Sequence, residues 1–202
     1  MAINLAALGV ETTLSGLVGD DEHAKQLRSA VEAKGVRWSV MPCPADTIVK
    51  LRVLSRNQQL IRMDFEAPLD DYADESFLQY ASNLIAEHDV VLLSDYAKGT
   101  LTNIEALISA CRVLNTPVLV DPKGADFSRY AGATLITPNL SEFEAVVGAC
   151  HQDDTVISAR ARHLCEQHGF EAVLVTRSER GMSLQSKDCL LYTSPSPRDD
   201  CP

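Results

Sequence analysis

The sequence lacks several features that would assign it to a common class. Its ten glycines are spaced so that no Gly-x-Gly occurs, which excludes the dinucleotide-binding fingerprint and the Walker loop. No apolar run approaches the roughly 20 residues that span a bilayer, and the N-terminal residues lack the basic opening of a secretory signal. Basic residues are few: 18 Lys and Arg stand against 28 Asp and Glu, for a net charge of −10. We therefore expect no membrane partner and no nucleic-acid partner, whereas a small polyanionic ligand remains possible in a locally positive pocket.

The six cysteines are scattered and form no Cys-x-x-Cys pair. This pattern favours reduced thiols in a cytoplasmic protein over a disulfide framework or a zinc site. With 202 residues, 46% of them hydrophobic and 23% charged, the chain has the composition of an ordinary globular protein. We expect one domain over residues 1–189.

Strands and helices alternate in the second half of the chain. Four short runs of Val, Leu and Ile, typical of strands buried on both faces, cover residues 89–95, 117–121, 133–137 and 172–176. Helical spacing of apolar residues covers 103–114, between the first two runs, and 141–147 and 156–168, between the last two. The pattern predicts an α/β fold with a parallel sheet between helices.

The first half of the chain has a different pattern of predicted helices and strands. It predicts helices over 2–8 and 22–34, a strand over 13–19, and a strand-rich region over about 36–66. Within that region, 47–55 and 59–65 are expected to form a hairpin. We interpret the region as a small β layer attached to the α/β core.

The end of the chain has a different composition. Residues 190–202 contain two Ser-Pro dipeptides and no strand or helix period, so we expect disorder there. Similar strings close unrelated environmental sequences, and we expect that this tail is not native.

Polar residues follow each predicted strand of the α/β region. Ligands of open parallel sheets bind beyond the carboxyl ends of the strands. A phosphorylated substrate with a metal-bound nucleotide would suit the carboxylates, lysines and amide found there, although loops are often polar without any function. The residues concerned are Asp95, Lys98, Asp121, Lys123, Asn139, Glu142 and 176–179.

Asn139 and Glu142 have two interpretations. Asn followed by Glu three residues later is a helix capping box. The same spacing also holds a carboxylate beside a helix N-terminus, where it can bind the waters of a Mg²⁺–phosphate complex. The spacing alone does not separate these roles.

The predicted hairpin carries four cations. They are either a solvated face of a small sheet, which is the usual case, or contacts to a sugar phosphate, which suits the forked guanidinium of arginine. The cations are Lys50, Arg52, Arg56 and Arg62. Asp95 and Asp121 are either ligand-side groups or helix caps.

Together the motifs resemble the ribokinase-like (PfkB-type) carbohydrate kinases. The resemblance covers about residues 2–184. The long string 50–62 is the more specific part, because it resembles the kinase domain of bacterial heptose-7-phosphate kinases. The other motifs lie at 93–99, 120–124, 137–148 and 174–182. The family implies a three-layer α/β/α core with a small β-sheet lid.

The resemblance also implies an activity, which is the transfer of the ATP γ-phosphate, with Mg²⁺, to D-glycero-β-D-manno-heptose 7-phosphate. It implies nucleotide and Mg²⁺–phosphate contacts at Asn139, Leu140, Ser141, Glu142, Thr176, Arg177, Ser178 and Gly181, with Glu142 reaching the metal through water. Substrate-side candidates are Lys50, Arg52, Arg62, Asp95, Lys98, Asp121 and Lys123. The family's lid often joins two subunits, so a homodimer is expected.

The sequence also departs from the family pattern. The opening strand with its substrate-binding Asp should precede Ala2, and a Gly-rich Asp motif that supplies the anion hole and catalytic base should follow Gly181. We find neither, so we expect a chain truncated at both ends, with no catalytic residue of its own and no turnover. The alternatives are a ribokinase-family kinase for another sugar, and a non-catalytic module that binds sugar phosphate or dimerises.

Overall fold

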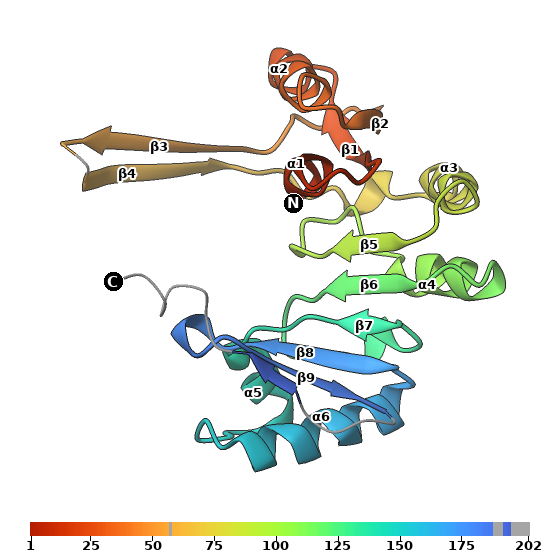
Figure 1. Ribbon diagram of the computed structural model, residues 1–202. Helices are drawn as coiled ribbons and strands as arrows, with labels where there is room; N and C mark the ends of the chain where they lie inside the picture. The colour runs from red at the N-terminus through yellow and green to blue at the C-terminus, as the bar shows by residue number, and fades with distance from the viewer. Residues whose placement is uncertain (57, 188–191, 195–202) are drawn as a thin grey trace. The chain divides into compact units, whose positions relative to one another are not determined.

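The computed structural model describes residues 1–56, 58–187 and 192–194 (Figure 1). These residues form two compact units. The first comprises Met1–Phe77 with Lys98–Thr102, and the second comprises Leu78–Ala97 with the chain from Asn103 onward. One domain over 1–189 stays a prediction.

The first unit opens with a strand–helix–strand motif. After α1 (Ala2–Ala7), strand β1 (Thr13–Gly19) and strand β2 (Arg37–Cys43) pair in parallel, with α2 (Glu22–Glu32) between them in sequence. Asp21 caps α2 by accepting from the amide of Ala24 at 2.8 Å, and its other carboxylate oxygen accepts from the amide of Thr47, also at 2.8 Å. A small apolar core contains Leu17, Cys43, Leu69, Ala73 and Phe77.

The hairpin predicted from the sequence is present in this unit (Figure 1). Strand β3 (Val49–Ser55) pairs antiparallel with β4 (Gln58–Phe65), and the register shifts between Val53 and Leu54. The predicted single β layer over 36–66 is wrong in one respect, because β2 pairs with β1 and β3–β4 forms a sheet of its own. Short 3-10 helix η1 (Asp70–Tyr72) follows the hairpin.

The second unit is built on a six-stranded sheet of order β10-β9-β8-β7-β6-β5 (Figure 1). Strands β5 (Val91–Ser94), β6 (Val118–Asp121), β7 (Leu135–Ile136) and β8 (Ala172–Thr176) are parallel. Strand β9 (Met182–Ser186) pairs antiparallel with β8, and the edge strand β10 (Tyr192–Ser194) pairs antiparallel with β9. The predicted parallel α/β sheet is confirmed, and β9 is an addition to it.

The helices of this unit begin where polar side chains can cap them. Helix α4 (Ile104–Val113) follows β5, α5 (Leu140–Val147) follows β7, and α6 (Asp154–His168) packs against β8 and β9. Asp153 caps α6 by accepting from the amide of Thr155 at 2.8 Å, and Gly169 ends it with φ 73°. The core contains the fully buried rings of Phe127, Tyr130, Phe143 and Phe170, and burial of each phenylalanine stabilises the fold by about 1.5–3 kcal/mol.

Helix α3 (Glu75–Ile85) lies where the sequence analysis assigned no element, and Asp74 caps it by accepting from the amide of Phe77 at 3.1 Å. At Tyr192–Ser194 the predicted disorder is wrong, because these residues form β10; the remainder of 190–202 lies outside the described residues. Among the helices that the structure describes, none has the length and apolar character needed to cross a bilayer.

Candidate functional site

The carboxyl ends of the parallel strands bring four predicted residues to one edge of the second unit's sheet. Ser94 at the end of β5 is in register with Asp121 at the end of β6, and the amide of Asp95 donates to the carbonyl of Asp121 at 2.9 Å. Asn139, three residues beyond β7, forms a parallel bridge with Thr176 at the end of β8. The convergence expected from the sequence therefore exists, since the ends of parallel strands meet at one edge.

Asn139 and Glu142 form the capping box at the start of α5. The side chain of Asn139 accepts from the amide of Glu142 at 2.9 Å, and Glu142 Oε2 accepts from the amide of Asn139 at 3.2 Å. Glu142 Oε1 accepts from Lys123 Nζ at 3.1 Å. The box thus places a carboxylate, an amide and a lysine at one point of the edge, while Leu140 and Ser141 continue the first turn of α5.

Asp121 lies beside this group. Its Oδ2 accepts from Ser94 Oγ at 3.3 Å. Burial raises the pKa of the Asp121 carboxyl, and the negative charge of Glu142 adds to the effect, while the Ser94 hydroxyl and Lys123 oppose it. A carboxyl that is costly to ionise and stands next to cationic and hydroxyl groups is typical of a binding site.

Asp95, predicted as a ligand-side residue, instead faces the protein interior. Its Oδ2 accepts from Tyr130 Oη at 2.8 Å and its Oδ1 accepts from the amide of Ala97 at 2.7 Å, and only 5% of the residue is exposed. Both carboxylate oxygens have partners within the protein. A direct ligand contact at Asp95 stays a prediction, and what the structure shows is a carboxylate held by Tyr130 and the amide of Ala97.

The loop 176–181 divides into exposed and buried residues. Thr176 and Ser178 are exposed, and Gly181 closes the loop, its carbonyl accepting from the amide of Arg177 at 2.8 Å. The Arg177 side chain, however, is buried, and it donates to Asp154 Oδ1 at 2.5 Å and to Ser183 Oγ at 2.9 Å. Its guanidinium thus links the loop to α6 and β9, so only the exposed part of the loop is available to a ligand.

The predicted cations of the first unit form an exposed charged cluster on the hairpin. Lys50 Nζ donates to Glu66 Oε1 at 2.7 Å, and Arg62 holds Asp64 through bonds of 2.8 and 2.9 Å. Lys98 pairs with the second oxygen of Glu66. The hydrogen bond from Lys50 lowers the pKa of Glu66, and the hydrogen bond from Arg62 lowers that of Asp64.

Gly99 explains why Lys98 reaches Glu66. Gly99 has φ 98°, and a Cβ there would collide with the backbone of Leu69 and Asp70. The amide of Leu69 donates to the carbonyl of Lys98 at 3.2 Å. A glycine is therefore required for this close approach, which brings Lys98 next to the end of the hairpin.

Arg52 differs from the other cations of the hairpin. It lies directly across from Arg62 on the same face, and in the described part of the chain no carboxylate pairs with it. Like charges opposite each other destabilise a sheet. Asp64 already offsets part of the charge of Arg62, and an anion bound near Arg52 would offset the remaining repulsion.

Sequence reasoning missed Tyr130 and its neighbour Arg129 in η2 (Ser128–Tyr130). Tyr130 is fully buried, and Arg129 stacks over its ring at 5.7 Å from the centroid. Their position next to Asp95 depends on the path of the loop after β6, which no local pattern revealed. The only signal was a tyrosine nine residues after a strand-end Asp.

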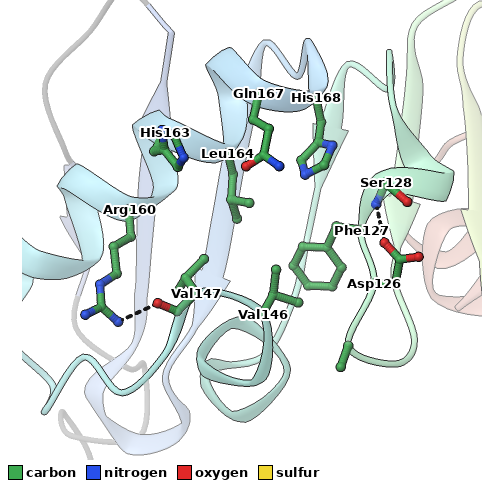
Figure 2. A pocket seen from close by; sticks show the side chains of 11 residues that line it. Asp126, Phe127, Ser128, Val146, Val147, Arg160, His163, Leu164, Gln167 and His168 are labelled. Carbon is green, nitrogen blue, oxygen red and sulfur yellow. Dashed lines mark hydrogen bonds between the residues drawn. The ribbon is translucent and has the colours of Figure 1, made fainter.

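A cavity of about 400 Å³ lies elsewhere in the second unit. Its lining comes from residues 125–128, the end of α5 and the last turns of α6 (Figure 2). Arg160 donates to the carbonyl of Val147 at 2.8 Å within it. The cavity shares no residue with the predicted site.

Comparison with known proteins decides the family. The sequence model of the pfkB family carbohydrate kinases matches residues 1–200. The chain belongs to the pfkB family of carbohydrate kinases. The predicted resemblance and the ribokinase-like α/β fold are thereby confirmed.

Curated relatives are substantially more similar than solved structures. The protein named "Bifunctional protein HldE" from Methylococcus capsulatus is 54% identical over 185 residues, covering 91% of this chain and 39% of the relative. The protein of the same name from Shewanella denitrificans is 50% identical over 190 residues, covering 93% of this chain and 40% of the relative. The chain thus spans about 40% of the length of the curated relatives that it matches.

Two solved structures share the fold. Ribokinase from Arabidopsis thaliana, complexed with ribose and ATP, has a TM-score of 0.73 at 19% identity, covering 97% of this chain and 64% of that chain. Phosphofructokinase-2 from Escherichia coli in complex with fructose-6-phosphate has a TM-score of 0.75 at 18% identity, covering 97% of this chain and 66% of that chain.

Proposed function

We propose that this chain is part of an ATP-dependent sugar-phosphate kinase. The substrate proposed is D-glycero-β-D-manno-heptose 7-phosphate, converted to the 1,7-bisphosphate for ADP-heptose and lipopolysaccharide-core biosynthesis. The observation that carries the proposal is the Asn139–Glu142 box beside Lys123 and Asp121 at the carboxyl edge of the sheet. Membership of the pfkB family and identity of 46–54% to the HldE proteins support it. A cytoplasmic location is part of the proposal.

The residues of the box fit a Mg²⁺–nucleotide. Mg²⁺ is usually held by one or two carboxylates together with waters and substrate phosphates. In the described residues no three His, Cys, Asp or Glu side chains lie close enough to hold a metal by themselves, which suits an ion held mainly by phosphate and water. Glu142 would contact it through water, because each carboxylate oxygen has a second lone pair beyond the bonds to Lys123 and Asn139. Bound there, Mg²⁺ would neutralise phosphate charge.

The nucleotide phosphates would lie at the N-terminus of α5. The first amides of a helix are donors without intrahelical partners, and the helix dipole favours anions there. Leu140 and Ser141 supply two of these amides, and Lys123 adds a positive charge. The exposed Thr176 and Ser178, with Gly181, would lie along the nucleotide.

The substrate phosphate would be bound by the hairpin cations. Arg52 and Arg62, opposite each other on one face, present two guanidinium groups to one anion, and arginine binds phosphate through two parallel bonds. Lys50 and Lys98 lie farther along the same charged cluster, on Glu66. Within the second unit, Asp121 is a separate substrate-side candidate that would accept a hydrogen bond from a sugar hydroxyl.

The opposite face of the hairpin supports the proposed homodimer. The cross-strand pairs Leu51–Met63 and Val53–Ile61 put apolar side chains on that face, and each of these residues is at least 39% exposed. Phe65, paired with Val49, is 57% exposed. A second copy of the hairpin would remove this apolar area from water.

Calorimetry on the full 202-residue chain tests the function. We expect Mg²⁺–ADP and heptose 7-phosphate to bind, and fructose 6-phosphate to bind at least tenfold more weakly, a difference of about 1.4 kcal/mol. Arg52→Gln should weaken heptose-phosphate binding by a similar factor and leave Mg²⁺–ADP binding unchanged. Arg28→Gln, which removes an exposed cation of α2, is the matched control and should change neither.

Two results would count against the proposed function, and a third would refute the expected lack of turnover. Preference for a non-phosphorylated sugar would overturn the heptose assignment. Sugar-phosphate binding without any Mg²⁺–nucleotide response would favour the non-catalytic module. The exposed apolar face of the hairpin also fits a module that dimerises. The chain itself is expected to show no turnover, because it contains no Gly-rich Asp motif, so measurable phosphorylation would refute that part.

A further inference from the structure

The hydroxyl of Tyr130 lies at the centre of a buried polar group in the second unit. Tyr130 is fully buried, and its Oη is 2.8 Å from Asp95 Oδ2, 3.0 Å from the amide nitrogen of Lys123 and 3.0 Å from the carbonyl of Lys123. Burial raises the pKa of Tyr130 to about 12. The hydroxyl therefore keeps its proton and is both a donor and an acceptor.

The bonds of this hydroxyl have a preferred direction. A phenol has one proton to donate, and a carboxylate is a stronger acceptor than a carbonyl. Tyr130 thus donates to Asp95 and accepts from the amide of Lys123. The result is a fixed connection from the end of β5 to the loop that follows β6.

Both carboxylate oxygens of Asp95 have partners inside the second unit. The second oxygen of Asp95 accepts from the amide of Ala97 at 2.7 Å, and Arg129 lies 3.7 Å from the first oxygen and stacks on the Tyr130 ring. Asp95 is only 5% exposed. Its negative charge is satisfied by the protein alone.

The loop that Tyr130 holds carries Lys123 to the proposed nucleotide site. Its Nζ donates to Glu142 Oε1, and the other oxygen of Glu142 accepts from the amide of Asn139. No helix or strand fixes the backbone at Lys123, and the next residue, Gly124, has φ 92°. The Lys123 side chain is 52% exposed, so its own packing does little to orient it.

We infer that Tyr130, oriented by Asp95, is a positioning residue that holds Lys123 against the Asn139–Glu142 box for binding of the Mg²⁺–nucleotide. The inference rests on the proposed function of that box. It gives Asp95 an indirect role through Tyr130, and it assigns a role to Tyr130, whose hydroxyl contacts Asp95 and the backbone of Lys123.

A double-mutant cycle on the full chain tests the inference. Tyr130→Phe removes only the hydroxyl, and Lys123→Met removes only the charge that the hydroxyl is inferred to position. We expect Tyr130→Phe to weaken Mg²⁺–ADP binding about tenfold. In the Lys123→Met background the same change should have less than about a twofold effect, because residues that act through one another are not additive.

Controls separate positioning from general loss of stability. Phe127→Leu changes a neighbouring buried ring, 6.2 Å away and without a hydroxyl; it should lower the melting temperature but leave Mg²⁺–ADP affinity within about twofold, the limit of ordinary additivity. Asp95→Asn keeps an acceptor for the tyrosine proton and should retain most of the affinity. Asp95→Ala, which removes the acceptor of the tyrosine proton, is the second test variant if Tyr130→Phe does not fold, and it should weaken Mg²⁺–ADP binding in the wild-type background but not in the Lys123→Met background.

The outcomes distinguish this inference from the proposed function. If the wild-type chain does not bind Mg²⁺–ADP, the proposed function fails and the inference fails with it. If the wild type binds and Tyr130→Phe binds equally well, or its effect is the same with and without Lys123, the inference alone is overturned. Weakened binding with a non-additive cycle supports both.

Discussion

The hairpin of the first unit and the sheet edge of the second contain polar contacts of nearly equal length in opposite surroundings. Lys50 Nζ lies 2.7 Å from Glu66, with 36% and 26% of the two side chains exposed. Tyr130 Oη lies 2.8 Å from Asp95, and both residues are buried. Exposed ion pairs contribute little to stability because water competes for them, whereas a buried polar group that loses its partner is costly. Distance alone therefore does not report the energy of a contact.

This difference in exposure also indicates different functional roles for the polar groups of the two regions. An exposed lysine or arginine can leave its carboxylate for a ligand phosphate at little cost, so the hairpin cations suit direct contact. A buried carboxylate such as Asp95 cannot change partners without an energetic penalty. It suits the fixed placement of other groups.

The largest expected effect comes from Asp95→Ala. Loss of two hydrogen bonds to a charged acceptor, at about 1.5 kcal/mol each, should lower the free energy of unfolding by about 3 kcal/mol. Urea unfolding followed by circular dichroism measures it. The matched change in the hairpin, Asp64→Ala, should leave the unfolding midpoint nearly unchanged. Equal shifts for the two variants would remove the contrast between the regions.

The next effect concerns the apolar face of the hairpin. We expect the wild-type chain to be a dimer and Leu51→Lys to weaken it about 100-fold, or about 2.7 kcal/mol, because an unpaired ammonium would be buried at the interface. Sedimentation over a range of protein concentrations measures the dissociation constant. Val113→Lys, at an apolar residue of α4 that is 77% exposed, is the control and should not change it. A wild-type chain that stays monomeric throughout would refute the homodimer.

Much of the second unit could be predicted from sequence, because its signals are local. Continuous Val, Leu and Ile runs mark strands buried on both faces, and observed β5, β6, β7 and β8 lie within the predicted ranges. The capping box was expected from two residues, Asn139 and Glu142, and is present with both of its bonds. Periodicity and capping need no knowledge of distant residues.

The errors arose where pairing is non-local. Strand β2 follows β1 and α2 in the same strand–helix–strand order that the second unit uses, so its parallel pairing with β1 could have been predicted. Its proximity in sequence to β3 and β4 led instead to its assignment to the wrong sheet. Strand β9 was missed because its pattern is mostly polar, with Ser183 and Gln185 buried through side-chain contacts. Likewise, Arg177 reads as a loop cation, and only the packing of Asp154 and Ser183 around it reveals its interior role.

The smallest effect distinguishes two carboxyl groups by the sign of their pH dependence. Because burial raises the pKa of Asp121 in the folded protein, the unfolded chain releases that proton first as pH rises from about 3.8. Stability is therefore lost through the interval between the unfolded and the folded pKa, and the penalty is complete above it. D121N should stabilise the protein at pH 7, with a gain that disappears as the pH falls toward 4, and should weaken sugar-phosphate binding.

D153N is the control of opposite sign. Hydrogen bonds from Thr155 lower the pKa of Asp153, so the stability contributed by its ionised form is present at pH 7 and lost on acidification. Urea midpoints at pH 4, 5.5 and 7 measure both variants, and a D121N protein less stable than wild type at pH 7 would show that the Asp121 charge stabilises the sheet edge.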